Sequence, residues 1–228
     1  MRTRKSRAER RQDLIEAARR AMIQHGTDTV LLNQVAEQAG LTSGAVLYHY
    51  PDLRDLLLEA HHAGMERFYE LRVKKIADLT DPVRKLVVTI RSGLPTDAED
   101  FDVRLLCELG GAAGRNRVYA ALLTTLYDRQ VSMYQTILEL GAAQGVFSLA
   151  ADSQTIARNL VALEDAYGYR IVARHPTLHA AEAVELILSY ARLVTGNPLD
   201  VPEEPAKPPR ARKATTARPP ARPGRPGA

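Results

Sequence analysis

The chain has 228 residues, of which 45% are hydrophobic and 25% charged, and it contains a single cysteine, Cys107. This length and composition are typical of a globular protein of one or two domains, and the lone cysteine excludes a disulfide framework and indicates a reducing compartment. No run of about 18 apolar residues occurs and no apolar segment follows the basic N-terminus, so we expect no membrane span and no secretory signal, and we predict a cytoplasmic protein.

The formal net charge of +4 is distributed unevenly along the chain. Residues 1–20 and residues 201–228 each carry a net charge of +5, whereas residues 21–200 carry −6. Basic ends on a mildly acidic body suit an acidic partner that the ends contact, although solvated termini would give the same distribution. Charge alone leaves both interpretations open.

Helical periodicity runs through almost every segment up to residue 197. The apolar spacing predicts a first helix from Arg7 to His25 and a short second helix from Leu32 to Ala39. The segment Thr42–Tyr50 fits another short helix. Asp52 is suited to cap a longer one that ends near Lys75.

The second half of the chain predicts five more helices. Asp81-Pro82 supplies an N-cap and a first-turn proline, and "GGAAGRN" is expected to be a flexible joint. The later helices are predicted at Phe101–Gly110, Arg117–Ala143, 153–175 after the Asp152 cap, and Leu178–Thr195. The expected fold class is therefore all-α, followed by a disordered basic tail rich in Pro and Arg over residues 198–228.

The segment around residues 32–50 has the layout of a helix-turn-helix. "LNQVAEQAG" supplies the first helix, Gly40-Leu41 the tight turn and "TSGAVLYHY" the second helix. Thr42 can cap the second helix, and the small Ser43, Gly44 and Ala45 would let its backbone approach base edges in a groove. Gly44 weakens a helix by about 1 kcal/mol relative to alanine, which a plain core helix has no reason to accept.

Polar and basic groups surround this predicted helix. Tyr48, His49 and Tyr50 carry tips that can donate to phosphate oxygens, and the six Arg and Lys residues from Arg2 to Arg11 could lie along adjacent phosphates. The alternative is a helical hairpin whose aromatic side chains are satisfied within the protein.

The block "VAEQAGLTSGAVLYHYPDLRDLLLEA" resembles the DNA-binding region of TetR-family transcriptional regulators. The resemblance covers about residues 8–70 specifically and extends weakly to about residue 196. It implies a three-helix DNA-binding domain at residues 8–70 and a helical effector-binding and dimerisation domain at residues 71–197. It further implies a homodimer formed by the last two helices, a near-palindromic operator in double-stranded DNA and a small-molecule effector that releases a repressor.

The sequence departs from the family pattern at three positions. Leu47 and Leu53 stand where the family usually has polar contacts, and Leu31 falls at the usual Ser/Thr cap of the second helix. We expect Tyr48 and Arg54 to take over the phosphate contacts. The predicted DNA-contacting residues are Thr42, Ser43, Gly44, Ala45, Leu47, Tyr48, His49, Tyr50 and Arg54.

The last two predicted helices are apolar around more than one face, as expected when a helix packs on its own core and on a partner. Ala166 and Gly168 would permit close approach between helices. The alternative is that both helices fill the core of a monomer.

The predicted effector pocket rests on weaker signals. Glu164 and Asp165 lie within an apolar run, and an inward carboxylate would favour a cationic or hydrogen-bonding effector. Each candidate is also compatible with ordinary core or surface. The candidate ligand-binding residues are Arg104, Cys107, Glu108, Tyr127, Tyr134 and Asp165.

Enzyme and metal patterns are weak. A di-iron bundle needs Glu-x-x-His on two helices, and only Glu59–His62 matches. We find no credible zinc set, phosphate-binding glycine loop or nucleophile–base pair, and we predict no catalytic activity, no cofactor and no metal.

Two points stay open at this stage. A helical small-molecule-binding or protein-interaction bundle that does not read DNA remains the alternative, supported by Leu47 and Leu53. In the tail, Gly224-Arg225-Pro226 is similar to the core of AT-hook minor-groove binders, whereas a solubilising tail is the simpler interpretation.

Overall fold

The computed structural model describes residues 6–201, and within this range the chain is all-α, with nine helices and no strand. The predicted fold class is confirmed. The helices are α1 (Arg7–His25), α2 (Leu32–Ala39), α3 (Ser43–His49), α4 (Leu53–Ile76), α5 (Pro82–Gly93), α6 (Phe101–Ala113), α7 (Arg117–Ala143), α8 (Ser153–Val172) and α9 (Ala180–Thr195). None of the helices described is long and apolar enough to cross a membrane.

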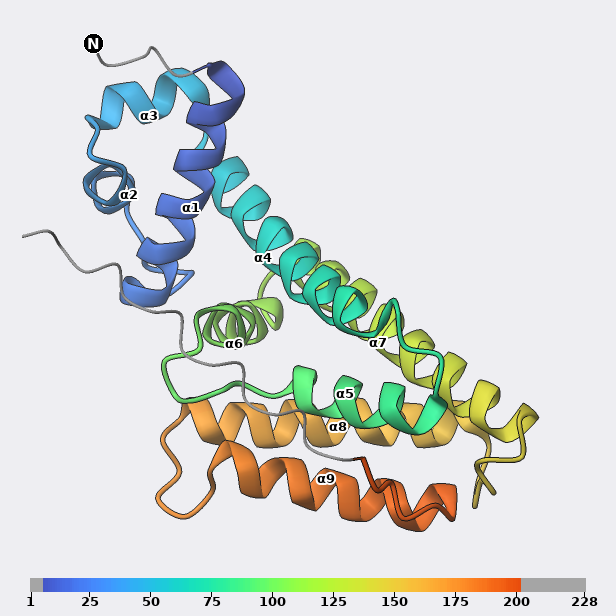
Figure 1. Ribbon diagram of the computed structural model, residues 1–228. Coiled ribbons are helices and arrows are strands. Elements are labelled where there is room, and N and C mark those ends of the chain that lie inside the picture. The colour runs from blue at the N-terminus through green and yellow to red at the C-terminus, as the bar shows by residue number, and fades with distance from the viewer. Residues whose placement is uncertain (1–5, 202–228) are drawn as a thin grey trace, which may run out of the picture.

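Helices α1, α2 and α3 form a small unit at one end of the molecule (Figure 1). The turn between α2 and α3 depends on Gly40, which adopts the left-handed conformation (φ +64°) and lets the Leu41 N–H donate to the Ala36 carbonyl at 2.9 Å. Thr42 caps α3 as predicted, because its hydroxyl oxygen accepts the Ala45 N–H at 3.3 Å. Leu31 cannot cap α2, and the Gln34 side chain accepts the Leu31 N–H instead at 2.7 Å.

The core of this unit includes a helix from the second half of the chain. Leu105 of α6 is buried among side chains of α1, α2 and α4. Gly64 permits this approach, since a Cβ on Gly64 would lie 2.5 Å from a Leu105 methyl group. Helix α6 therefore lies between α1 above and α8 below (Figure 1).

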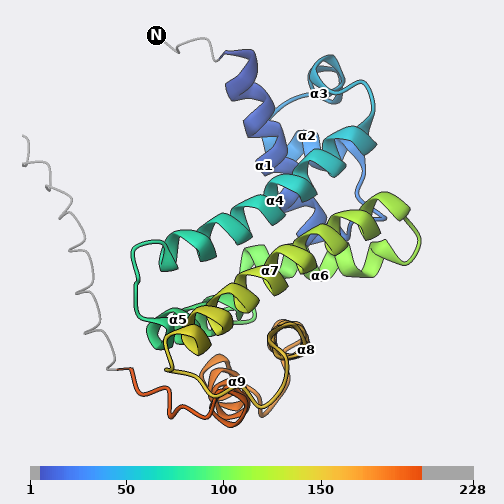
Figure 2. The ribbon, with the colours of Figure 1, turned by 90° about the vertical axis from the view of Figure 1, so that its right-hand side faces the viewer.

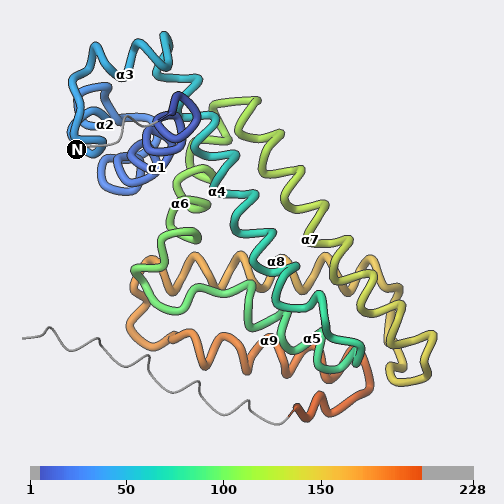
Figure 3. Tube along the Cα trace, turned by 45° about the horizontal axis from the view of Figure 1, so that its top comes forward, coloured from blue at the N-terminus to red at the C-terminus, as the bar shows by residue number. Residues whose placement is uncertain are grey.

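Helix α4 runs from the α1–α3 unit down to α5, with α7 along its side (Figure 2). Its first half packs into the core of α1–α3, and its middle, through Met65 and Phe68, packs against α6 and α7. A third cluster joins α5, α7, α8 and α9 at the far end, where α8 and α9 lie beside each other (Figure 3). One continuous helix thus touches all three cores.

Several element ends differ from the sequence-based expectation. Helix α6 continues past Gly110 to Ala113, because Leu109 and Ala112 are buried and their packing outweighs the low helix propensity of the glycine pair. In place of the predicted flexible joint there is only a short turn before Asn116, whose side chain caps α7. Helix α8 ends at Val172, ahead of Arg174 with φ +58°.

The last helix and the segment after it also begin at other residues than predicted. Helix α9 starts at Ala180, after a buried Leu178. The predicted disordered tail begins too early at residue 198, because Leu199 is buried and packs on the cluster of α5 and α7–α9. The rest of the predicted tail, with Gly224-Arg225-Pro226, lies outside the described residues.

Candidate functional site

The outer face of α3 is exposed to solvent. Thr42, Gly44, Leu47 and Tyr48 are exposed, with Tyr48 at 80%, while Val46 points inward and is fully buried. Ser43, Ala45 and His49 are half-buried at the edges of this face. The helical period therefore anchors α3 through Val46 and leaves eight of the nine predicted DNA-contacting residues at least partly accessible.

Gly44 has no internal reason to be glycine. Its φ angle is not positive, and a Cβ placed on it would meet no atom within 4 Å from the described residues beyond its own helix turn. A larger side chain would therefore be compatible with the fold of the free protein. A need for a small side chain at position 44 would therefore come from a molecule that binds to the outer face of α3.

Tyr50 is a correction to the predicted set. Its side chain is only 2% exposed, and its hydroxyl donates to Glu59 at 2.8 Å. The Arg11 guanidinium lies 4.2 Å from the centre of the Tyr50 ring and pairs with the same Glu59 oxygen at 2.7 Å. Burial raises the pKa of the Tyr50 hydroxyl, and the Glu59 carboxylate adds to this. Tyr50 and Arg11 thus fasten α3 and α1 to α4 and do not present polar tips to phosphate.

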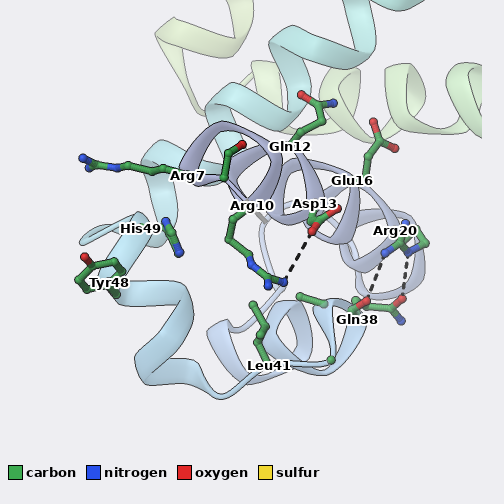
Figure 4. Close-up of a pocket in the computed structure, with 13 residues that line it drawn as sticks. Arg7, Arg10, Gln12, Asp13, Glu16, Arg20, Gln38, Leu41, Tyr48 and His49 are labelled. Atoms are coloured by element: carbon green, nitrogen blue, oxygen red, sulfur yellow. Dashed lines mark hydrogen bonds and ion pairs between the residues drawn. The ribbon is translucent and has the colours of Figure 1, made fainter. Parts of the chain in front are cut away.

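A groove of about 1210 Å³ lies between α1 and the ends of α2 and α3 (Figure 4). Its polar groups are largely engaged with one another. Arg10 pairs with Asp13 at 3.6 Å, and the Arg20 guanidinium donates to the Gln38 side chain at 3.3 Å and to the Gln38 carbonyl at 3.2 Å. The lining carries three arginines, Arg7, Arg10 and Arg20, against the two carboxylates of Asp13 and Glu16, so its net charge is slightly positive.

The remaining polar groups near α3 lie at its C-terminal end and beyond. Tyr48 packs edge-on against His49, with ring centres 5.1 Å apart, and Nδ1 of His49 has no hydrogen-bond partner among the described residues. Arg7 extends away from the first turn of α1 (Figure 4). Arg54 is exposed at the start of α4. Arg2, Arg4 and Lys5 lie outside the described residues.

A second cavity, the bundle pocket, has a volume of about 600 Å³ and lies between α4, α6, α7 and α8. Three of the six predicted ligand residues line it: Cys107, Tyr127 and Asp165. Burial raises the pKa of the Cys107 thiol, with further contributions from Glu108 and Asp165, which disfavours a reactive thiolate. The sequence-based set omitted Phe68 and Gln130, because nothing local marks a side chain as facing a cavity formed by distant helices.

The other three predicted ligand residues do not line the bundle pocket. Arg104 pairs with Glu99 at 2.8 Å near the surface. Glu108 points to the opposite side of α6, where it accepts the Thr27 N–H at 3.2 Å. Tyr134 is fully buried and reaches the pocket only through its hydrogen bond to Glu164.

Behind the bundle pocket, a buried ion pair joins α4 to α8. Arg72 Nη2 donates to Oε1 of Glu164 at 2.8 Å, and the hydroxyl of Tyr134 donates to the same oxygen. Burial raises the pKa of the Glu164 carboxyl to about 7 despite the opposing attraction of Arg72. Gly93 makes room for this carboxylate, because a Cβ there would overlap it. A single set of contacts therefore links α4, α5, α7 and α8.

Helix α6 carries polar links to the α1–α3 unit on the side away from the bundle pocket. The buried Arg19 of α1 pairs with Asp102 at 2.5 Å, and the exposed Arg67 of α4 approaches the same carboxylate at 3.4 Å. Asp28, just after α1, pairs with Arg115 at the end of α6. A displacement of α6 at the pocket would thus act directly on α1.

The outer surface of α8 and α9 exposes large apolar side chains. Tyr169 is 61% exposed, Leu193 is 77% exposed and Leu186 is also exposed. Ala166 lies on this surface as well. Gly168 does not, because it is buried against Pro95 and Val103 of its own chain, so the close approach that it permits lies within one subunit.

No group of three or more His, Cys, Asp or Glu side chains in the described range is arranged to hold a metal ion. His62 of the single Glu-x-x-His match is exposed, whereas the neighbouring His61 is buried and its Nε2 lies 3.2 Å from the Thr27 hydroxyl. Burial lowers the pKa of His61 to about 4. The residue therefore belongs to the core between α1 and α4.

Comparison with known sequences places a family match on the α1–α3 unit. Residues 14–60 match the model described as bacterial regulatory proteins, tetR family. The probable acrEF/envCD operon repressor of Escherichia coli strain K12 is 36% identical over a segment that covers 30% of this chain and 39% of that protein. The chain thus spans well under half the length of this relative.

Comparison with solved structures extends the likeness to most of the fold. A Saccharomonospora viridis protein described as a transcriptional regulator, solved in complex with choline, is 22% identical with a TM-score of 0.75 and covers 81% of this chain and 96% of its own. A TetR transcription regulator from Haloarcula marismortui is 22% identical with a TM-score of 0.73, covering 82% and 98%. At these identities the likeness shows a shared fold.

Proposed function

We propose that this chain, whose residues 14–60 match the tetR family of bacterial regulatory proteins, is a ligand-responsive transcriptional regulator, a dimeric repressor that a small-molecule effector releases from its operator. The single observation that carries the proposal is the outer face of α3. It presents small and polar side chains around Gly44, which the fold itself does not need to be small. A recognition helix in a major groove requires such a face.

We assign DNA contact to the accessible members of the predicted set and leave out Tyr50. Ser43, Gly44 and Ala45 would approach base edges, and Tyr48 and Arg54 would contact phosphates. This assignment implies an α1–α3 DNA-binding domain that ends within α4, close to the predicted boundary at residue 70. The remainder, to about residue 197, would bind the effector and the partner subunit.

The exposed apolar side chains of α9 support a homodimer. Leu186 and Leu193 of α9 would be costly to leave in water on a monomer and would suit a two-fold, self-complementary interface. Tyr169 of α8 lines the bundle pocket and is not counted in this interface. Two recognition helices related by such an axis would read a near-palindromic operator whose half-sites lie about 34 Å apart or a multiple of that distance. We place the protein in the cytoplasm and assign it no catalytic role, cofactor or metal.

The position of α6 supports the proposed response to ligand. One side of α6 lines the bundle pocket, and the other is tied to α1 through Asp102 and to the start of the α1–α2 loop through Glu108. An effector that prefers a different position of α6 would shift the spacing of the two α3 helices. The effector must bind the non-operator conformation more tightly for this to release DNA.

Selection of bound sequences from random DNA duplexes tests the proposal. We expect enrichment of a near-palindrome, and we expect Tyr48→Ala to weaken binding to that sequence by at least about fivefold, the equivalent of about 1 kcal/mol. His62→Ala, at an exposed position on α4, serves as the matched control and should bind as wild type does.

Failure of this selection would favour the second candidate function, a helical bundle that binds small molecules or proteins without reading DNA. The exposed Leu47 on the outer face of α3 is the observation that supports it. No enriched sequence at low salt, where phosphate contacts are strongest, would favour this alternative over the regulator.

A further inference from the structure

The bundle pocket is lined by acids without a balancing base. Among the described residues that line it, Glu164 and Asp165 carry ionisable carboxyl groups, and there is no Lys, Arg or His. Surrounding protein raises the pKa of the Asp165 carboxyl to about 6, although the residue reaches solvent at the pocket mouth. Both carboxylates thus sit where additional positive charge would be stabilising.

Glu164 is only partly satisfied by the protein. The residue is 2% exposed, and its Oε1 accepts from both Arg72 and Tyr134. Its Oε2 is buried and has no hydrogen-bond partner in the described part of the chain. A buried carboxylate oxygen without a donor is costly, and a group bound in the pocket could supply the missing interaction.

Arg72 balances one of the two negative charges but does not make the pocket an anion site. Its Nε and Nη1 also lack hydrogen-bond partners among the described residues. However, Arg72 is 1% exposed and does not line the pocket, and its guanidinium carbon lies 5.5 Å from the Phe68 ring centre and 5.7 Å from that of Tyr134. Above about pH 7, where Glu164 is ionised and paired to Arg72, the charge left for a ligand to match is that of Asp165, a single negative charge.

The rest of the lining suits an apolar body with a positive centre. Phe68, Tyr127 and Tyr169 contribute aromatic rings from three different helices. Aromatic faces attract ammonium-type cations, by about 2 kcal/mol where the cation is desolvated. The volume of about 600 Å³ lies within the range usual for small-molecule pockets.

We propose that the bundle pocket binds a monovalent organic cation, an apolar molecule that bears one ammonium-type centre, with Asp165 and Oε2 of Glu164 as its counter-groups. The identification of this ligand as the effector rests on the proposed regulatory function. Binding itself does not, so the two can fail separately.

Titration calorimetry on the full chain with two shape-matched pairs of probes, which differ in charge, tests the proposal. The first pair is tetraphenylphosphonium and tetraphenylborate, in potassium-free buffer, which share a shape and differ in the sign of charge. The second is phenyltrimethylammonium and its uncharged carbon isostere, tert-butylbenzene. We expect each cation to bind at least about tenfold more tightly than its counterpart, consistent with one nearby carboxylate at intermediate dielectric.

Two variants locate the site. Asp165→Asn should weaken cation binding by about tenfold, because it removes the unbalanced charge without changing the shape. Asp128→Asn removes the same charge from an exposed position of α7 that does not line the pocket and should leave binding within about twofold of wild type. Circular dichroism checks that both variants remain helical.

The outcomes are distinct. Preference for tetraphenylborate, equal binding within either pair, no binding of either cation at millimolar concentration, or an Asp165→Asn variant that binds as wild type does would overturn the cation assignment and leave the DNA-binding function intact. Cation binding that leaves operator affinity unchanged would support the ligand class while refuting the pocket as the effector site.

Discussion

The buried carboxyl of Glu164 makes the stability of this protein depend on pH in a defined direction. Burial raises its pKa from 4.5 to about 7, because desolvation outweighs the attraction of Arg72 and Oε2 receives no hydrogen bond. The folded state therefore holds the proton more tightly than the unfolded state. The stability that Glu164 contributes is fully present below about pH 4.5 and is lost as pH rises through about 7.

The magnitude follows from the size of this shift. A difference of about 2.5 units corresponds to about 3 kcal/mol at about 1.4 kcal/mol per unit, of which about 2–3 kcal/mol falls between pH 5 and pH 8. Glu164→Gln removes the titrating group. Gln is neutral and similar in size, so the variant resembles wild type with Glu164 protonated and its stability carries no titration of this group.

Urea unfolding followed by circular dichroism at fixed protein concentration, between pH 5 and pH 8, measures this contribution. The free energy of unfolding of wild type minus that of Glu164→Gln should fall by about 2–3 kcal/mol across this range. His61 and Asp165 titrate in both proteins, so their effects largely cancel in the difference. A difference that stays flat with pH would show that Arg72 keeps Glu164 fully ionised, and the reasoning would be refuted.

Three further predictions concern α3, the outer surface of α8 and α9, and the core between α1 and α4. Gly44→Ala should keep or raise the free energy of unfolding, by less than about 1 kcal/mol, while weakening operator binding in a gel-shift assay; unchanged affinity would argue against close approach at this position. Leu193→Asp should shift the protein from dimer to monomer in sedimentation velocity with helicity retained, and a persistent dimer would place the interface elsewhere. Wild type should lose about 3 kcal/mol of stability as pH falls from 6.5 toward 4, because the folded state resists protonation of His61, and His61→Gln should remove this loss. If the free energy of unfolding in urea depended on pH equally in the two proteins, the low pKa of His61 would be contradicted.

Local sequence patterns were sufficient to predict most helices of this chain. Apolar spacing with Gly26, Gly40 and the Asp52 cap predicted α1, α2 and the start of α4 as the structure has them. The Thr42 cap and the exposed outer face of α3 also followed from the order of residues in the turn and the helix. These features depend on neighbours within about four residues, which the sequence displays directly.

The tertiary structure alone decided which polar side chains are available to ligands. Tyr50 and Tyr48 carry the same phenol two residues apart, yet Arg11 and Glu59 hold Tyr50 inside while Tyr48 faces solvent. No local pattern distinguishes them, because the partners of Tyr50 lie on two other helices.

The same holds for the bundle pocket. Arg72 and Glu164 are 92 residues apart, and their pairing leaves Asp165 as the unbalanced charge. Likewise, burial of Leu109 and Ala112 keeps α6 helical through the glycine pair, where the sequence predicted a flexible joint. Residue order determined the helices and the exposed outer face of α3. Burial of charges between distant helices determined the pocket, since desolvation depends on the surroundings in space and not on neighbours along the chain.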